Sequence, residues 1–122
     1  MGTLPKSERL KGKVAVSALM SKGRWGHARG LKYCYASGKA DESGSAPNRV
    51  LVSVPKKLFK RAVKRNLLKR RMREAYRTNK DLLPACGTDL MLIYNSPEIN
   101  SFETIREQVT IILKRIDDER QL

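Results

Sequence analysis

The sequence predicts one α+β domain in which a small sheet of three to four strands is packed with helices. In two segments, large apolar residues alternate with other residues at the strand period of two. A third segment is an apolar run between a glycine and a proline, with the length of a buried strand. In the last segment, apolar residues recur at the helical period. A chain of 122 residues has the size of one domain and can bury over ~60% of its unfolded surface. We therefore expect residues 1–122 to form one domain with the order helix, strand, strand, helix, strand, helix.

A basic arm and a short helix are expected at the N-terminus. Residues 1–13 contain four cations and one acid, interrupted by Pro5 and Gly12, so we expect a flexible, extended basic arm. Val14 to Lys22 (VAVSALMSK) is expected to form a helix that stops at Gly23. The β-branched Val14 and Val16 are also compatible with the start of a strand.

Two strands are expected before the middle of the chain. Leu31 to Ala36 (LKYCYA) and Arg49 to Val54 (RVLVSV) alternate with the period of two that a strand requires. The residues between them, Ser37 to Asn48, are small and polar, which is typical of a surface loop. We therefore expect the two strands to pair as an antiparallel hairpin with a long loop.

The second half of the chain is expected to form a helix, a strand and a helix. Pro55 ends the second strand, and a helix follows from about Phe59 to Thr78. Thr88 to Asn95 fits a buried strand, which lies parallel to the second strand if the two are neighbours. Asn100, three residues before Glu103, is a variant of the capping box that begins a helix. The apolar repeat of that last helix consists of Phe102, Ile105, Val109, Ile112, Leu113 and Ile116.

The basic segment Lys56–Arg77 indicates function. It contains 11 of the 26 Lys and Arg residues within 22 positions, with Glu74 as its one acid. A helix face that serves only solubility carries both signs of charge. A polyanionic partner explains a segment with many cations and a single acid, because each cation near a phosphate releases a condensed counterion and so contributes to affinity. The net charge of +14 supports nucleic acid as the partner class, with an anionic membrane surface second.

A helical projection divides this basic helix into two faces. At ~100° per residue, one arc of about 140° collects Arg65, Asn66, Lys69, Arg70, Arg73 and Arg77. Arginine forks suit a phosphate backbone because they bind phosphate through two hydrogen bonds. Asn66 is neutral, and it either reads a base edge or sugar hydroxyl or bonds to local backbone. The other side carries Leu68, Met72, Ala75 and Tyr76, with Lys64 and Arg71 projecting from its middle along apolar surface.

The sequence AVKRNLLKRRMRE (residues 62–74) resembles the signature of the protein subunit of bacterial ribonuclease P. That signature has Ala-Val, Arg-Asn, Lys-Arg and Arg-Glu at fixed helical spacing. The preceding RVLVSVPKK (residues 49–57) is similar to the family's strand and Lys-Lys turn. Arg9-Leu10, Lys22-Gly23, Asp89 and the amphipathic last helix extend the resemblance over nearly the whole chain. The resemblance implies the family's fold, including a left-handed βαβ crossover where right-handed crossovers are the default.

The resemblance also implies an activity that belongs to a ribonucleoprotein. In the family, a partner RNA with bound magnesium cleaves precursor tRNA and leaves a 5′ phosphate on the mature tRNA, while the protein does no chemistry itself. The implied partners are ribonuclease P RNA and the single-stranded 5′ leader of precursor tRNA. No catalytic residue, metal ligand or cofactor is expected in the protein. The residues expected to bind RNA are Lys56, Lys57, Lys60, Arg61, Lys64, Arg65, Asn66, Lys69, Arg70 and Arg73.

The leader is expected in a cleft between the first helix and the sheet, to which we assign Arg9, Val16, Met20, Tyr33, Cys34 and Tyr35. The sequence departs from the family there. Val16 and Met20 stand where members often carry phenylalanines, and Cys34 stands where an aromatic residue is expected. We therefore predict leader binding that depends on charge more than on stacking. Trp25 is either a base-stacking residue or a packed loop residue, and His27 has no assigned role.

Other classes of function fit the sequence less well. Metal or acid–base chemistry on phosphodiesters uses clustered carboxylates or histidines, whereas the acids here are scattered. A helix-turn-helix DNA binder needs two helices joined by a short turn. A ribosomal-protein-like RNA-binding module is the alternative that composition leaves open.

The cellular setting is also predicted. No apolar run approaches the ~20 residues of a membrane span, and the N-terminus lacks a signal-peptide core. Cys34 and Cys86 have no metal-binding spacing and are expected to be reduced. We therefore expect a cytoplasmic protein without a membrane partner or an obligate protein partner.

Overall fold

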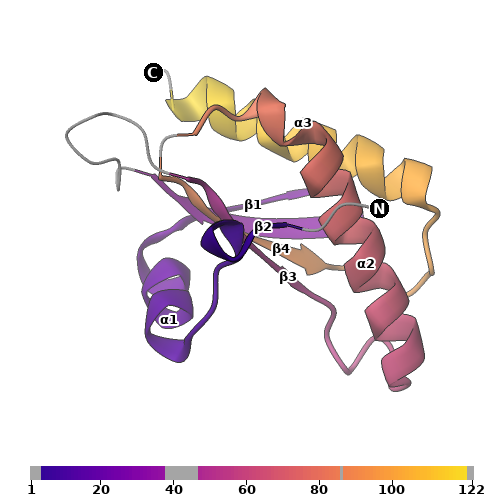
Figure 1. Ribbon diagram of the computed structural model, residues 1–122. Helices are drawn as coiled ribbons and strands as arrows, with labels where there is room; N and C mark the ends of the chain where they lie inside the picture. The colour runs from indigo at the N-terminus through magenta and orange to yellow at the C-terminus, as the bar shows by residue number, and fades with distance from the viewer. Residues whose placement is uncertain (1–3, 38–46, 86, 121–122) are drawn as a thin grey trace.

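A mixed four-stranded sheet with helices on both faces forms the fold (Figure 1). The computed structural model describes residues 4–37, 47–85 and 87–120. Most of the predicted loop between Ser37 and Asn48 lies outside the described residues. In chain order the elements are η1 (Lys6–Glu8), α1 (Lys13–Lys22), β1 (Arg24–Ala28), β2 (Leu31–Ala36), β3 (Arg49–Ser53), α2 (Ala62–Asn79), η2 (Lys80–Leu82), β4 (Asp89–Tyr94) and α3 (Phe102–Arg120).

The strand order is β1-β2-β4-β3, so β4 lies between β2 and β3. β3 and β4 are parallel neighbours, which confirms the predicted βαβ unit. β4 pairs antiparallel with β2, and the hairpin predicted between Leu31–Ala36 and Arg49–Val54 is therefore wrong. Nearly every residue of β4 is buried, and a strand that is apolar on both faces takes a central place with a neighbour on each side. The handedness of the crossover stays a prediction.

β1 is a strand that the sequence analysis missed, because RWGHA has no apolar alternation. It pairs antiparallel with β2 from Arg24 opposite Tyr35 to Ala28 opposite Leu31. The tight turn between the two strands places Arg29 at φ 52°, in the left-handed region that such turns require. β1 therefore forms one edge of the sheet, and β3 forms the other.

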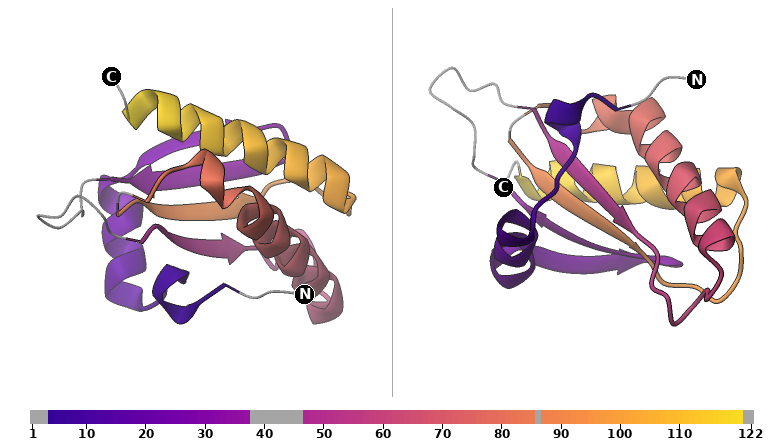
Figure 2. Two further views of the ribbon diagram at one scale, coloured as in Figure 1. Left: turned by 45° about the horizontal axis from the view of Figure 1, so that its top comes forward. Right: turned by 60° about the horizontal axis from the view of Figure 1, so that its bottom comes forward.

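Alternation along the strands divides the core into two clusters, one on each face of the sheet. Figure 2 shows the helices on these faces, with α2 and α3 on one and α1 on the other. The larger cluster lies beneath α2 and α3 and contains the five predicted α3 residues from Ile105 to Ile116, all fully buried. The smaller cluster lies beneath α1 and consists of Leu10, Leu19, Cys34 and Met91 with partly buried neighbours. Two helices therefore cover one face of the sheet, and one short helix covers part of the other.

The N-terminal arm is packed from Leu4 onward. Leu4 and Leu10 are buried, and Arg9 forms a parallel bridge with Val50 on β3. The Leu10 amide donates to the Val50 carbonyl at 3.0 Å. The prediction of a flexible arm over residues 1–13 is therefore wrong for residues 4–13, because two leucines give the arm a core-facing side. The arm covers part of the β3 edge, which would otherwise expose unpaired backbone groups.

The starts of α2 and α3 differ from the prediction by a few residues. α2 begins at Ala62 rather than near Phe59, since Phe59 is buried against Tyr94 with ring centroids 5.9 Å apart. Ser101 rather than Asn100 caps α3, because its Oγ accepts the Thr104 amide at 3.2 Å. Asn100 serves another role: its backbone amide donates to the Tyr94 hydroxyl at 2.9 Å.

Candidate nucleic-acid interface

Helix α2 buries one face and presents cations on the other. Leu68, Met72, Ala75 and Tyr76 are buried, as the helical projection predicts. Val63 is 80% exposed, so the first turn of the helix stands clear of the core. Among the predicted RNA-binding residues, Arg65 and Lys69 are half-buried, and the exposed ones are Lys56, Lys57, Lys60, Arg61, Lys64, Asn66, Arg70 and Arg73.

Two arginines of α2 are engaged with backbone carbonyls. Arg65 Nη1 donates to the carbonyls of Phe59 and Lys60 at 2.8 and 2.7 Å, so it fastens the preceding turn to the helix. Arg71 Nη1 donates to the Asn100 carbonyl at 2.6 Å and joins α2 to the loop before α3. Arg71 is thus explained as a structural residue. The helix is not buried at Lys64, which is exposed.

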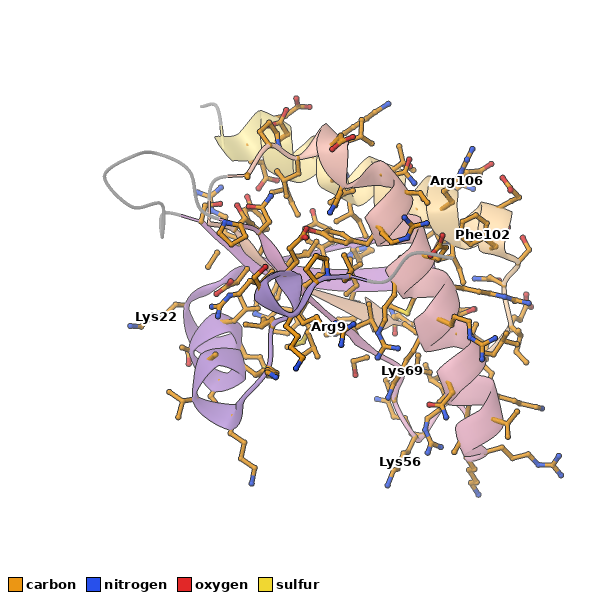
Figure 3. All side chains as sticks on the ribbon, in the orientation of Figure 1. Arg9, Lys22, Lys56, Lys69, Phe102 and Arg106 are labelled. Carbon is orange, nitrogen blue, oxygen red and sulfur yellow. The ribbon has the colours of Figure 1, made fainter. Side chains whose placement is uncertain are left out.

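A hollow of about 560 Å³ lies between the arm, the edge of β3 and α2. Its cations are Arg9 and Lys11 from the arm and Arg70, Arg73 and Arg77 from α2; its apolar lining is Leu4, Leu10, Val50, Leu51 and Val52. Figure 3 shows Arg9 on the side of the molecule where α2 carries Lys69, while Lys22 and Arg106 lie elsewhere. The fold therefore brings Arg9, which was assigned to the leader cleft, together with the basic helix.

Two cations of this hollow were not among the predicted RNA-binding residues. Arg77 belongs to the predicted arc but was left out of the RNA-binding set, although its spacing of four from Arg73 places both on one helix face. Lys11 was missed because an arm predicted to be flexible gives no position for its side chains.

Glu74 is the acid among these cations, and Arg77 binds it. Arg77 Nη2 donates to Glu74 Oε1 at 2.5 Å, and Nε donates to Oε2 at 3.1 Å. Hydrogen bonding by Arg77 lowers the pKa of Glu74, so the carboxylate stays ionised at neutral pH. Because this pair is neutral, the excess positive charge of the hollow comes from Arg9, Lys11, Arg70 and Arg73.

The face of the sheet beneath α1 holds only part of the predicted leader cleft. Val16 and Cys34 pack there, and Met20 is an exposed residue of α1. Tyr33 and Tyr35 point to the opposite face, where they are 4% and 5% exposed in the larger cluster. Their assignment to the leader cleft is therefore wrong, because neighbours along a strand alternate between faces.

Two of these side chains, Tyr35 and Cys34, form hydrogen bonds that hold them in the fold. The Tyr35 hydroxyl donates to the Glu119 carboxylate on α3. The Cys34 thiol donates to the Leu19 carbonyl at 3.3 Å, and burial raises the pKa of this thiol. Cys34 therefore stays protonated at neutral pH and packs as a small apolar residue.

Two further properties concern the described part of the chain. Within it, no three His, Cys, Asp or Glu side chains are grouped so that they could hold a metal ion. Its helices include none with the length and apolar character that crossing a membrane requires.

Comparison with known proteins decides the family. The family model described as Ribonuclease P matches residues 4–117. The chain belongs to the ribonuclease P protein family. A relative from Chlorobaculum tepidum named ribonuclease P protein component is 47% identical, over 96% of this chain and 84% of the relative. Another relative of that name, from Chlorobium phaeobacteroides, is 32% identical over 95% of this chain and 89% of its own length.

Solved structures of ribonuclease P proteins share the fold. The Staphylococcus aureus protein superposes with a TM-score of 0.74 at 26% identity, covering 91% of this chain and 96% of the other. The Thermotoga maritima protein superposes with a TM-score of 0.73 at 27% identity, covering 88% of this chain and 96% of the other. The α+β fold predicted from the sequence is confirmed, as is the family resemblance. Membership in the ribonuclease P protein family gives the chain the role of a protein subunit in tRNA processing and implies that it binds RNA.

Proposed function

We propose that the chain assists a catalytic ribonuclease P RNA in removing the 5′ leader from precursor tRNA, without contributing a reacting group itself. The observation that carries this proposal is the meeting of the arm, β3 and α2 around one cationic hollow. The hollow and the exposed arc of α2 bind the RNA subunit, and the side of the sheet beneath α1 binds the leader.

The chemistry of the cations supports a binding role. Arginine guanidinium and lysine ammonium groups are hydrogen-bond donors without an acceptor, so they bind phosphate but do not act as a base toward water. The partner RNA supplies magnesium and the reacting groups. The protein offsets repulsion between two RNAs, so less magnesium is needed to bring precursor and catalyst together.

The compartment follows from the same proposal. We place the chain in the cytoplasm, where tRNA precursors meet the RNA subunit. The unpaired thiol of Cys34 suits a reducing compartment.

The first experiment measures cleavage of a 5′-extended precursor tRNA by bacterial ribonuclease P RNA at low magnesium, with and without the protein. We expect the protein alone to be inactive and the RNA to become active when the protein is added. The double variant Arg70→Ala/Arg73→Ala should weaken this stimulation. Its affinity for the RNA should also depend less on salt, with the slope of log K against log [salt] reduced by about 1.4 to 1.8.

The matched control is Arg106→Ala/Lys114→Ala, which removes the same charge from exposed positions of α3. This variant should stimulate cleavage as the unaltered protein does. Equal losses in the two double variants would show that net charge, and not the α2 arc, carries the effect. RNA binding without stimulated cleavage would overturn the proposed function and leave a non-catalytic RNA-binding module.

A further inference from the structure

The strand register places Trp25 on the same face of the sheet as α1. Trp25 pairs with Cys34, and Cys34 pairs with Met91 on β4. Cys34 and Met91 both belong to the cluster beneath α1. Because directly paired residues project from the same face, Trp25 continues this row toward the β1 edge, beyond the part of the sheet that α1 covers.

The next row along the same face carries polar and basic groups. His27 pairs with Lys32, and Lys32 pairs with Ile93. His27 and Lys32 are exposed, and Ile93 is half-buried. The side of the sheet that faces α1 thus ends in an open surface made of Trp25, His27 and Lys32.

Trp25 is held in position although its ring is accessible. The side chain is 46% exposed, and its indole Nε1 donates to the Met20 carbonyl at the end of α1 at 3.3 Å. The Lys32 ammonium lies 5.7 Å from the ring centroid. An aromatic ring fixed at its edge, with an exposed lysine over its face, loses little freedom when a planar ligand takes the place of that lysine.

The charge around Trp25 favours an anionic ligand. The 32 residues between Glu8 and Asp41 contain eight Lys and Arg residues and no acid. On the other face of β1, Arg24 lies 3.6 Å from Glu119 of α3, so this ion pair is on the opposite face of the strand from Trp25. An aromatic face beside unpaired cations is the combination with which proteins bind single-stranded nucleic acid.

We propose that Trp25 stacks on an unpaired base of the precursor tRNA leader, and that Lys32 binds the phosphate of the same nucleotide. This inference rests on the proposed function and names the residue that reads the leader. The base takes the place of the Lys32 ammonium over the ring, and the ammonium moves to the phosphate. Trp25 thereby supplies the aromatic surface that Val16, Met20 and Cys34 do not provide, and leader binding uses stacking as well as charge.

The decisive experiment combines Trp25→Ala with abasic nucleotides in the leader. Holoenzyme is reconstituted from the protein and ribonuclease P RNA, and its affinity is measured for mature tRNA, for precursor tRNA, and for precursors with one leader base removed. We expect Trp25→Ala to weaken precursor binding about 5- to 100-fold and to leave mature tRNA binding unchanged. One abasic position should cause a similar loss with the unaltered protein and almost no further loss with Trp25→Ala.

A second measurement does not depend on a variant. Trp25 is the one tryptophan of the chain, so the intrinsic fluorescence of the holoenzyme reports on its ring directly. Precursor tRNA should quench this fluorescence more than mature tRNA does, and the critical abasic position should abolish the difference.

Controls separate stacking from folding. Trp25→Phe keeps an aromatic face and should retain most of the affinity, and Ile111→Ala alters an exposed apolar residue on α3 and should have no effect. If Trp25→Ala retains full preference for precursor over mature tRNA, the inference is wrong while the proposed function stands. If the unaltered holoenzyme shows no preference for precursor, the proposed function fails and the inference fails with it.

Discussion

Glu74 is an acid placed among cations, and its pairing with Arg77 determines the net positive charge of the hollow. Its two oxygens bind Arg77, so one of the five cations that line the hollow is neutralised. The pair is partly exposed, and solvent screening leaves such pairs with little effect on stability. Its effect on the local charge is therefore more important than its effect on folding.

Glu74→Gln should strengthen RNA binding. The change removes one negative charge from the hollow and frees Arg77, so the salt dependence of RNA affinity should steepen by about 0.7 to 0.9 in log K per log unit of salt. Binding titrations at several salt concentrations measure this slope. Glu107→Gln on α3 is the matched control and should leave the slope unchanged. Weaker binding by Glu74→Gln would mean that the carboxylate orients Arg77 toward the RNA.

Tyr76 links stability to alkaline pH. Burial, with a smaller contribution from the charge of Glu8, raises the pKa of Tyr76 to about 12. The unfolded chain titrates near ~10, so between these values the unfolded state has lost the proton that the folded state keeps. The free energy of unfolding should therefore fall as pH rises through this range. At pH ~11 the loss from Tyr76 should be about 1.4 kcal/mol.

Urea unfolding at pH 8 and pH 11 measures this loss. Tyr76→Phe removes the titrating hydroxyl, so its stability should fall less between the two pH values than that of the unaltered protein. The difference between the two proteins, rather than either value alone, isolates Tyr76 from the other titrating groups. An identical pH dependence in both proteins would contradict the raised pKa.

The junction between α1 and β1 depends on the absence of a side chain at Gly23. A Cβ at this position would lie 2.5 Å from Cys34 Sγ and 2.6 Å from the Leu19 carbonyl oxygen. The carbonyl oxygen belongs to the helix backbone and cannot move without bending α1. Gly23→Ala should therefore destabilise the protein by about 1–3 kcal/mol. Denaturant unfolding measures the loss, and Ser21→Ala, two residues earlier at an exposed position, should change stability little.

Elements with a clear apolar period could be predicted from the sequence. The buried face of α2 and the core positions of α3 follow from local patterns. The order strand–helix–strand predicted β3 and β4 to be parallel if they are neighbours, and the structure shows that they are. β1 could not be predicted, because it is held by backbone pairing with β2 and buries only Ala28. The pairing of β2 with β4 depends on contacts between distant segments, which no local pattern reports.

The candidate site could also be predicted only where it depends on local sequence. The composition and helical spacing of α2 were enough to locate the cationic arc. The positions of Arg9 and Lys11 depend on the docking of the arm to β3, which brings them to α2. The alternation of β2 was recognised, but choosing which of its faces meets α1 requires the position of α3. Without that position, residues from both faces of the strand were assigned to the cleft, and of these Cys34 lies beneath α1 while Tyr33 and Tyr35 lie on the opposite face.

The two faces of the sheet are unequally covered, and their stabilities should differ. α1 buries a single residue, Leu19, whereas α3 buries five apolar residues in the larger cluster. Local opening is easiest where few apolar contacts hold an element. Hydrogen exchange should therefore show the amides of α1 exchanging through a low-energy local opening, and those of α3 and β4 exchanging near the global free energy of unfolding.

Leader RNA should slow exchange in α1 if it binds on that face. Comparing the holoenzyme with and without precursor tRNA tests this expectation, and α3 provides the internal control. Equal protection of α1 and α3 in the free protein would contradict the inequality between the two clusters.

The central place of β4 in the sheet determines the order in which a ribosome can produce this fold. β2 and β3 both pair with β4, and β4 ends at Tyr94, so most of the sheet cannot form until three quarters of the chain has been translated. At ~5–20 residues per second, that moment comes about 5–19 s after initiation. Helix α2 has been translated by then, while β3 still lacks a strand partner. The nascent protein therefore exposes its basic helix α2, close to the ribosome, before it has the strand that completes its core.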